Sequence, residues 1–133
     1  MMDAYRVARG ARQCIVVLAG ALCVSCHPVT DGVIARSELL TVVASGPRSA
    51  RVLRLDAAPG ARINARLLPV LELRDGTRVS FTSDALDADS SYFAASPTAT
   101  VRSTRATRGT LLASVCPASA RVCLQAKLDV ELR

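Results

Sequence analysis

Hydrophobic and polar residues alternate most regularly at the C-terminal end of the chain. From Val122 to Leu132 every second residue is apolar, and Cys123 or a polar residue stands at each position between them. A period of two is typical of a β-strand with one face on a core and the other in water. The pattern therefore predicts a half-buried final strand over residues 122–132.

Short apolar and β-branched runs separated by turn signals precede this strand. Pro59-Gly60 and Asp75-Gly76 are dipeptides that favour turns. The runs that we predict to be strands are residues 39–44, 51–55, 67–73, 78–82, 98–103 and 110–116. With the final strand, about seven or eight short strands predict an all-β fold, an immunoglobulin-like antiparallel β-sandwich. Ser83–Ala88 is expected to form one helical turn.

The first part of the chain has a different pattern. Arg6, Arg9 and Arg12 precede an uncharged, largely apolar run from Cys14 to Val24. This is the layout of a secretory signal, and the run is too short to span a bilayer. A buried core helix is the alternative. We predict the following organisation: a signal peptide of the lipoprotein type over residues 1–25, a tether over 26–38 and a β-sandwich domain over 39–133.

The sequence Leu22-Cys23-Val24-Ser25-Cys26 resembles a bacterial lipobox, the signal for attaching diacylglycerol to a cysteine thiol. The resemblance implies that Cys26 is the lipid-attachment residue and the first residue of the mature protein. It also implies multiple acylation, which stable anchoring requires, because one acyl chain binds a membrane only marginally. We expect an exported protein, lipid-anchored in the periplasm or outer cell envelope. Ordinary signal cleavage nearby is the alternative.

Composition argues against several classes of function. The formal net charge is +6, but charges of both signs alternate along most of the chain and aromatic residues make up only 3%. A platform of aromatic residues for stacking bases is therefore missing, and no nucleic-acid partner is expected. The one histidine, His27, lies in the predicted tether, so neither a Ser-His-Asp triad nor a zinc site is expected. We predict no cofactor.

Cys116 and Cys123 are the only cysteines that follow Cys26. If residues 110–116 and 122–132 form a hairpin, the alternation places both cysteines on the face away from the core. Two interpretations of the pair remain open. In one, a disulfide staples a hairpin of an exported domain. In the other, the pair cycles between dithiol and disulfide, and Arg121 lowers the pKa of a nearby thiol.

A family resemblance bears on this choice. The run Asp56–Leu73 and the Cys-x6-Cys-Leu sequence from Cys116 to Leu124 resemble the N-terminal periplasmic domain of DsbD-type thiol:disulfide interchange proteins. The resemblance implies a candidate thiol:disulfide oxidoreductase that exchanges electrons with a membrane reductase and with thioredoxin-fold protein partners. It implies that Cys116 and Cys123 are the redox pair, and that Cys123 forms the mixed disulfide. Tyr92 and Phe93 would then form a cap over the disulfide. A non-catalytic envelope lipoprotein, in which the bond is only a staple, is the alternative.

Overall fold

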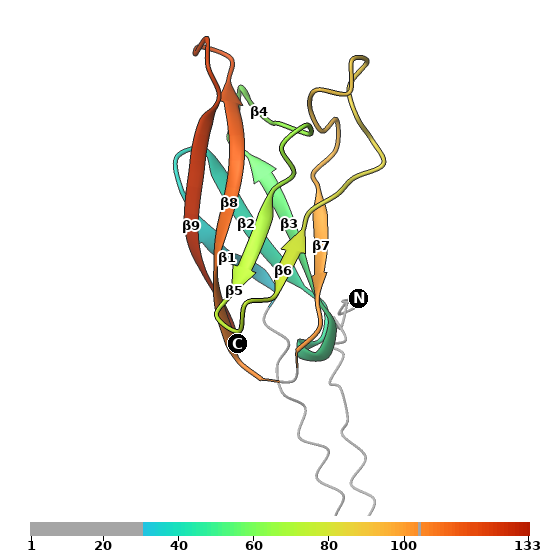
Figure 1. The fold of residues 1–133 in the computed structure, drawn as a ribbon, viewed down its shortest axis with the longest axis vertical. Helices are drawn as coiled ribbons and strands as arrows, with labels where there is room; N and C mark the ends of the chain where they lie inside the picture. Colours follow the sequence, from blue (N-terminus) through green and yellow to red (C-terminus); the bar gives the residue numbers. More distant parts are fainter. Residues whose placement is uncertain (1–30, 104) are drawn as a thin grey trace, which may run out of the picture.

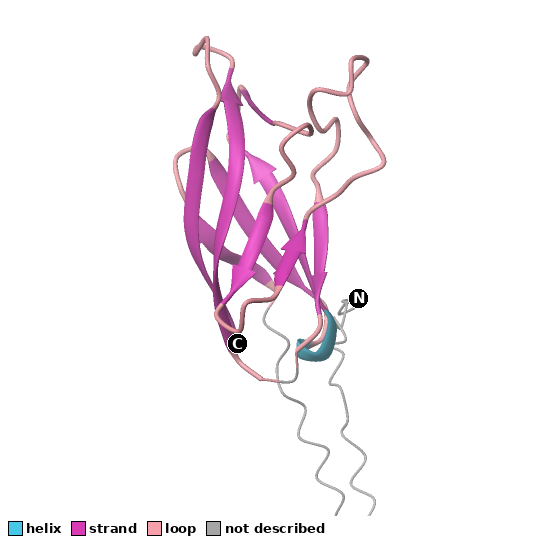
Figure 2. Cartoon of the chain, in the orientation of Figure 1, coloured by secondary structure: helices cyan, strands magenta, loops and turns pink. Residues whose placement is uncertain are grey.

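The computed structural model describes residues 31–103 and 105–133, which form two antiparallel β-sheets packed face to face (Figure 1). The four-stranded sheet has the order β1-β2-β3-β7, and the five-stranded sheet the order β4-β8-β5-β6 with β9 paired to β8. The strands are β1 Gly32–Arg36, β2 Leu40–Ser45, β3 Arg51–Ala57, β4 Ala61–Ile63, β5 Val70–Leu73, β6 Arg78–Ser80, β7 Thr98–Val101, β8 Thr107–Pro117 and β9 Leu124–Leu132. The only helical element in this part of the chain is a 3-10 turn, Arg48–Ala50 (Figure 2).

The core lies between the two sheets and is built from alternate residues of their strands. Leu53 and Leu55 of β3 are fully buried, as are Leu111 and Val115 of β8. Phe81, which follows β6, is the largest fully buried side chain. Because alternate strand residues point to opposite faces, each strand gives one set of side chains to this core and the other to the surface.

Strand β8 is the centre of the five-stranded sheet. Along one side it pairs with β9 over nine residue pairs, from Thr107↔Leu132 to Val115↔Leu124. Along its other side it pairs first with β5 and then, near its C-terminal end, with the short strand β4. The C-terminal end of β8 therefore has strand neighbours on both sides.

The two sheets are joined along one edge of the sandwich. Thr82, just after β6, and Thr98 of β7 form a bridge in which each backbone N–H donates to the other carbonyl, at 2.9 and 3.0 Å. At the opposite edge β1 and β9 lie side by side, one from each sheet.

The predicted all-β antiparallel sandwich is confirmed, and a strand forms within or over each predicted run. Two of the nine observed strands have no counterpart in the prediction. β1 lies within residues 26–38, the range expected to be a tether, and it is ordered because Ile34 and Ala35 pack against the core. β4 has only three residues, too few to show a periodic pattern.

The helical turn predicted over Ser83–Ala88 is wrong, because the segment is an irregular loop. The backbone groups of the segment are taken up by the returning chain: the N–H of Asp87 donates to the carbonyl of Tyr92 at 3.0 Å, and the carbonyl of Ala85 accepts from the N–H of Ala94 at 2.8 Å. These groups are therefore not available for hydrogen bonds within a helical turn.

The predicted signal peptide, Cys26 and His27 lie outside the described residues. Among residues 31–103 and 105–133, no helix has the length and apolar character needed to cross a membrane.

Candidate functional site

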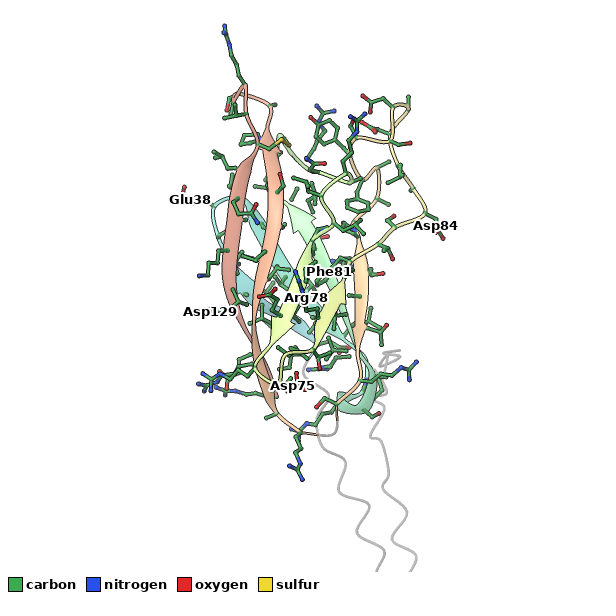
Figure 3. The ribbon with its side chains drawn as sticks, viewed as in Figure 1. Glu38, Asp75, Arg78, Phe81, Asp84 and Asp129 are labelled. Carbon is green, nitrogen blue, oxygen red and sulfur yellow. A yellow bond between two sulfur atoms is a disulfide. The ribbon has the colours of Figure 1, made fainter. Side chains whose placement is uncertain are left out.

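Cys116 and Cys123 form a disulfide at the tip of the β8–β9 hairpin. The two residues stand directly opposite each other, one step beyond the last ladder pair, Val115↔Leu124, and their Cα atoms are 4.0 Å apart. The sulfur–sulfur bond is visible in Figure 3 near the end of the sandwich that lies away from the C-terminus. The bond thus closes the loop of residues 117–122 at the end of a regular ladder.

Both cysteines lie on the outer face of the five-stranded sheet, as the sequence pattern predicts. Leu111, Ala113 and Val115 of β8 belong to the hydrophobic core, so Cys116 falls on the other face. The pairing with β4 agrees, because Ile63, opposite Val115, is in the core, while Arg62, opposite Cys116, is exposed.

The two cysteines differ in exposure although they share a face. Cys116 is 7% exposed, whereas Cys123 is an exposed residue. The topology explains the difference: Cys116 is flanked by β4 on one side and by Cys123 on the other, while Cys123 stands at the margin of the sheet. Sequence alternation gives the face of a residue but not which strands flank it, so this asymmetry was not predictable.

Arg62 is the cross-strand neighbour of Cys116 on β4. Its guanidinium carbon lies 3.8 Å from the centroid of the Tyr92 ring, a cation–π contact. Tyr92 itself forms an isolated bridge with Asn64, two residues beyond Arg62. Cys123, Cys116, Arg62 and Tyr92 therefore follow one another across this end of the sheet.

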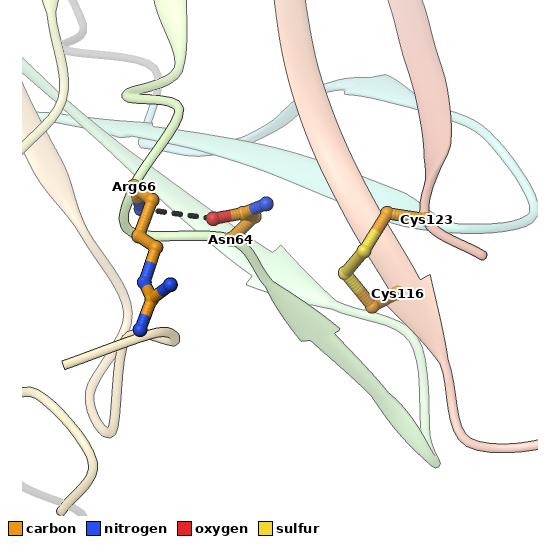
Figure 4. The surroundings of a disulfide bond; sticks show 4 residues. All are labelled: Asn64, Arg66, Cys116 and Cys123. Atoms are coloured by element: carbon orange, nitrogen blue, oxygen red, sulfur yellow. Dashed lines mark hydrogen bonds between the residues drawn. A yellow bond between two sulfur atoms is a disulfide. The ribbon is translucent and has the colours of Figure 1, made fainter. Parts of the chain in front are cut away.

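Asn64 is a residue at the site that the sequence analysis did not single out. Its Oδ1 accepts a 2.8 Å hydrogen bond from the backbone N–H of Arg66, and its alternation with Arg62 places it on the same face as Cys116. Figure 4 shows Asn64 between Arg66 and the disulfide, with its amide nitrogen on the side of the sulfurs. The pairing of β4 with β8 brings Asn64 here, and no sequence motif marks it.

The predicted aromatic pair is divided between two environments. Tyr92 contacts Arg62, the cross-strand neighbour of Cys116, whereas Phe93 packs against the hydrophobic core. Together they line a pocket of about 360 Å³ at this end of the sandwich, with Arg62 and Asp87 also in its wall. Tyr92 is thus the last residue of the row that begins with Cys123, and Phe93 lies further inside the sandwich.

Charged groups around the site are mostly basic. Arg62, Arg66 and Arg121 are exposed residues of β4, of the segment after it and of the hairpin loop. The facing loop carries acidic residues as well, among them Asp87, which lines the pocket with Arg62, and Asp89. The pKa of Asp89 is lowered, first by hydrogen bonding to the backbone N–H of Ser91 and also by Asp87 and the positive charge of Arg66. In the described part of the chain, no three His, Cys, Asp or Glu side chains are arranged to hold a metal ion.

Comparison with known protein families, with curated proteins and with solved structures finds no significant match to this chain.

Proposed function

We propose that this protein is an exported, lipid-anchored electron carrier whose Cys116–Cys123 disulfide exchanges with the dithiols of thioredoxin-like partners. The observation that supports the proposal most directly is the unequal exposure of the two cysteines on the outer face of the sheet. A thiol–disulfide exchange needs one sulfur that an incoming thiolate can reach and a second that leaves. Exposed Cys123 and covered Cys116 fit these two roles.

The exchange has two steps in this assignment. A partner thiolate attacks the sulfur of Cys123, the Cys116–Cys123 bond breaks, and Cys116 leaves as a thiolate that then takes up a proton. The second thiolate of the partner attacks the partner sulfur of the mixed disulfide and releases Cys123. The partner is oxidised to its disulfide, and this protein gains two electrons and two protons. The reverse sequence oxidises Cys116 and Cys123 and reduces a partner.

The surroundings of the bond support these roles. Arg62, opposite Cys116, places a cation on the strand beside the thiolate that departs, and positive charge favours a thiolate over a thiol. Val122 and Leu124, on either side of Cys123, are 67% and 45% exposed. Exposed apolar side chains around a reactive sulfur suit transient contact with another protein.

Export and anchoring rest on the sequence of residues 1–26. The basic and apolar segments support export, and the lipobox resemblance supports acylation of Cys26. An oxidising compartment also suits a chain whose two remaining cysteines pair with each other. A lipid anchor would hold the protein close to a membrane reductase partner.

A non-catalytic envelope lipoprotein is the second candidate, and the burial of Cys116 favours it. In that case the bond only staples the β8–β9 hairpin. The reduction potential of the pair, measured by equilibration with glutathione, separates the two functions. We expect a potential above about −300 mV, within the range of exchange proteins. A lower value would mark a structural bond and overturn the proposal.

A further inference from the structure

The loops at the two ends of the sandwich differ in charge (Figure 1). At the end away from the disulfide, the described residues outside the strands carry five arginines and two aspartates: Arg48, Arg74, Arg102, Arg105, Arg133, Asp31 and Asp75. At the disulfide end, the corresponding residues carry two arginines and four acidic side chains: Arg66, Arg121, Glu38, Asp84, Asp87 and Asp89. Positive charge is therefore in excess at the end that lies away from the disulfide.

Four of these arginines, Arg48, Arg74, Arg102 and Arg105, form a surface that we call the arginine end. All four are exposed, and the salt bridges found among the described residues include none of them. The backbone N–H of Arg74 donates a 3.0 Å hydrogen bond to the carbonyl of Arg108, which holds the β5–β6 turn against the start of β8. Their guanidinium groups are thus available to a charged partner.

Both sheets contribute to the arginine end. The 3-10 turn that carries Arg48 contacts β7, and the pair Arg51↔Val101 of β3 and β7 places Arg102 next to this turn. Asp31, one of the two aspartates here, is 3.6 Å from Arg51 in a salt bridge. The unpaired positive charge is therefore spread over the whole end of the sandwich, which suits a broad surface more than a small ligand.

The start of β1 lies at this same end, because Gly32 pairs with Ala44, close to the 3-10 turn. Gly32 is six positions after Cys26, so the chain between them reaches at most about 20 Å. Arg108 and Cys116 are eight residues apart on β8, and a strand rises about 3.3 Å per residue, so the disulfide stands about 26 Å from this end. A lipid on Cys26 would therefore bring the arginine end, and not the disulfide, to the membrane.

We propose that the arginine end docks on a membrane surface of anionic phospholipids and holds the disulfide away from that surface. An anionic bilayer attracts arginines that lie within a Debye length of it, and guanidinium groups bind phosphates through paired N–H donors. The same bilayer repels the acidic loops at the other end, which favours a single orientation. A partner dithiol must then be carried by a domain that stands off the membrane. The anchor at Cys26 belongs to the proposed function, whereas the charge distribution does not depend on it.

Modification of arginines with phenylglyoxal tests the orientation. The full chain with Cys26→Ser, which lacks the acceptor thiol, is mixed with vesicles of equal parts phosphatidylglycerol and phosphatidylcholine, or of phosphatidylcholine alone. Mass spectrometry then follows each arginine. We expect those of the arginine end to react at least about fivefold more slowly on the anionic vesicles, and Arg66 and Arg121 to react equally on both. Protection at the disulfide end, or no difference between the ends, would overturn the proposal.

Two double variants in the same Cys26→Ser background separate the arginine end from net charge. Arg74→Gln/Arg105→Gln removes two charges from this end, while Arg36→Gln/Lys127→Gln removes two from the end of β1 nearest the disulfide and from the middle of β9. In vesicle flotation the first should bind the anionic vesicles at least about tenfold more weakly than the parent, and the second should bind like the parent. All four side chains are exposed, so circular dichroism should show an unchanged fold. Equal weakening of both variants would mean attraction by net charge alone and would refute a docking surface.

Discussion

The hydroxyl of Ser96 donates a 2.6 Å hydrogen bond to Oδ1 of Asp56, which ties the loop before β7 to strand β3. The two carboxylate oxygens of Asp56, Oδ1 and Oδ2, also accept hydrogen bonds from Nε and Nη2 of Arg54, at 3.0 and 2.9 Å. This loop carries Tyr92 and part of the wall of the pocket that Tyr92 shares with Arg62. A carboxylate on the opposite sheet thus helps to hold one side of the candidate site.

The Asp56 carboxylate makes the free energy of unfolding depend on pH. The pKa of Asp56 is lowered from its ordinary value of 3.8, first by hydrogen bonding to Arg54 and also by Ser96, with partial burial opposing them. Because the pKa of this carboxyl is lower in the folded protein than in the unfolded chain, the ionised group stabilises the fold at pH values above the pKa of the unfolded chain. This stabilisation is lost as the pH falls through the pKa of the folded protein. We expect Asp56→Asn to be less stable than the wild type at neutral pH. The difference in free energy of unfolding between the two proteins, measured by urea unfolding, should become smaller below pH 3.8.

Ser96→Ala is the matched control, because it removes one hydrogen bond and leaves the Arg54–Asp56 pair in place. It should show the same pH trend with a smaller amplitude. A deficit of Asp56→Asn that stays constant across the acid range would contradict this role of the carboxylate.

Single cysteine variants test the assignment of the two sulfurs. Cys116→Ala leaves the exposed Cys123 without its internal partner, so a mixed disulfide with a thioredoxin-fold protein should accumulate. Cys123→Ala leaves only the covered Cys116 and should trap little or none. Non-reducing gel electrophoresis after incubation with the partner disulfide measures both. Each variant loses the same bond, worth about 2.5 kcal/mol by loop entropy, so the two are matched in this respect. Equal trapping would refute the assignment.

Arg62→Gln tests the charge beside Cys116. A charge several ångströms from the departing thiolate in water-like surroundings contributes about 0.6 kcal/mol, so we expect exchange with dithiothreitol to slow about threefold. Stopped-flow kinetics at low ionic strength measure the rate, and added salt should reduce the difference. Arg48→Gln, in the 3-10 turn, is a control in which the rate should stay unchanged. A slowing that persists at high salt would indicate a packing effect through Tyr92 instead.

Lipid attachment can be tested in cells by metabolic labelling with palmitate. The wild type should incorporate label, and Cys26→Ser should not, because the acceptor thiol is lost. Cys23→Ser is the matched control, since its site lies in the segment that cleavage removes, and it should retain label. Label retained by Cys26→Ser would show that another residue carries the lipid.

The sequence predicts the strands with a clear period and leaves the short or irregular ones unrecognised. The alternation from Val122 to Leu132 is long enough to give both the last strand and the outward face of Cys123. Ala61–Ile63 and Gly32–Arg36 become strands through pairing with β8 and β2, and three to five residues carry too little pattern to reveal this. The positions of Asn64 and Arg62 beside Cys116 depend on that same pairing.

The placement of the disulfide has a consequence for any cycle of reduction and oxidation. The bond stands outside the nine-pair ladder of β8 and β9, not within it. None of the nine residue pairs of this ladder includes either cysteine, so reduction would remove a link at the tip and no pair of the ladder. We therefore expect the reduced protein to keep the fold of the sandwich.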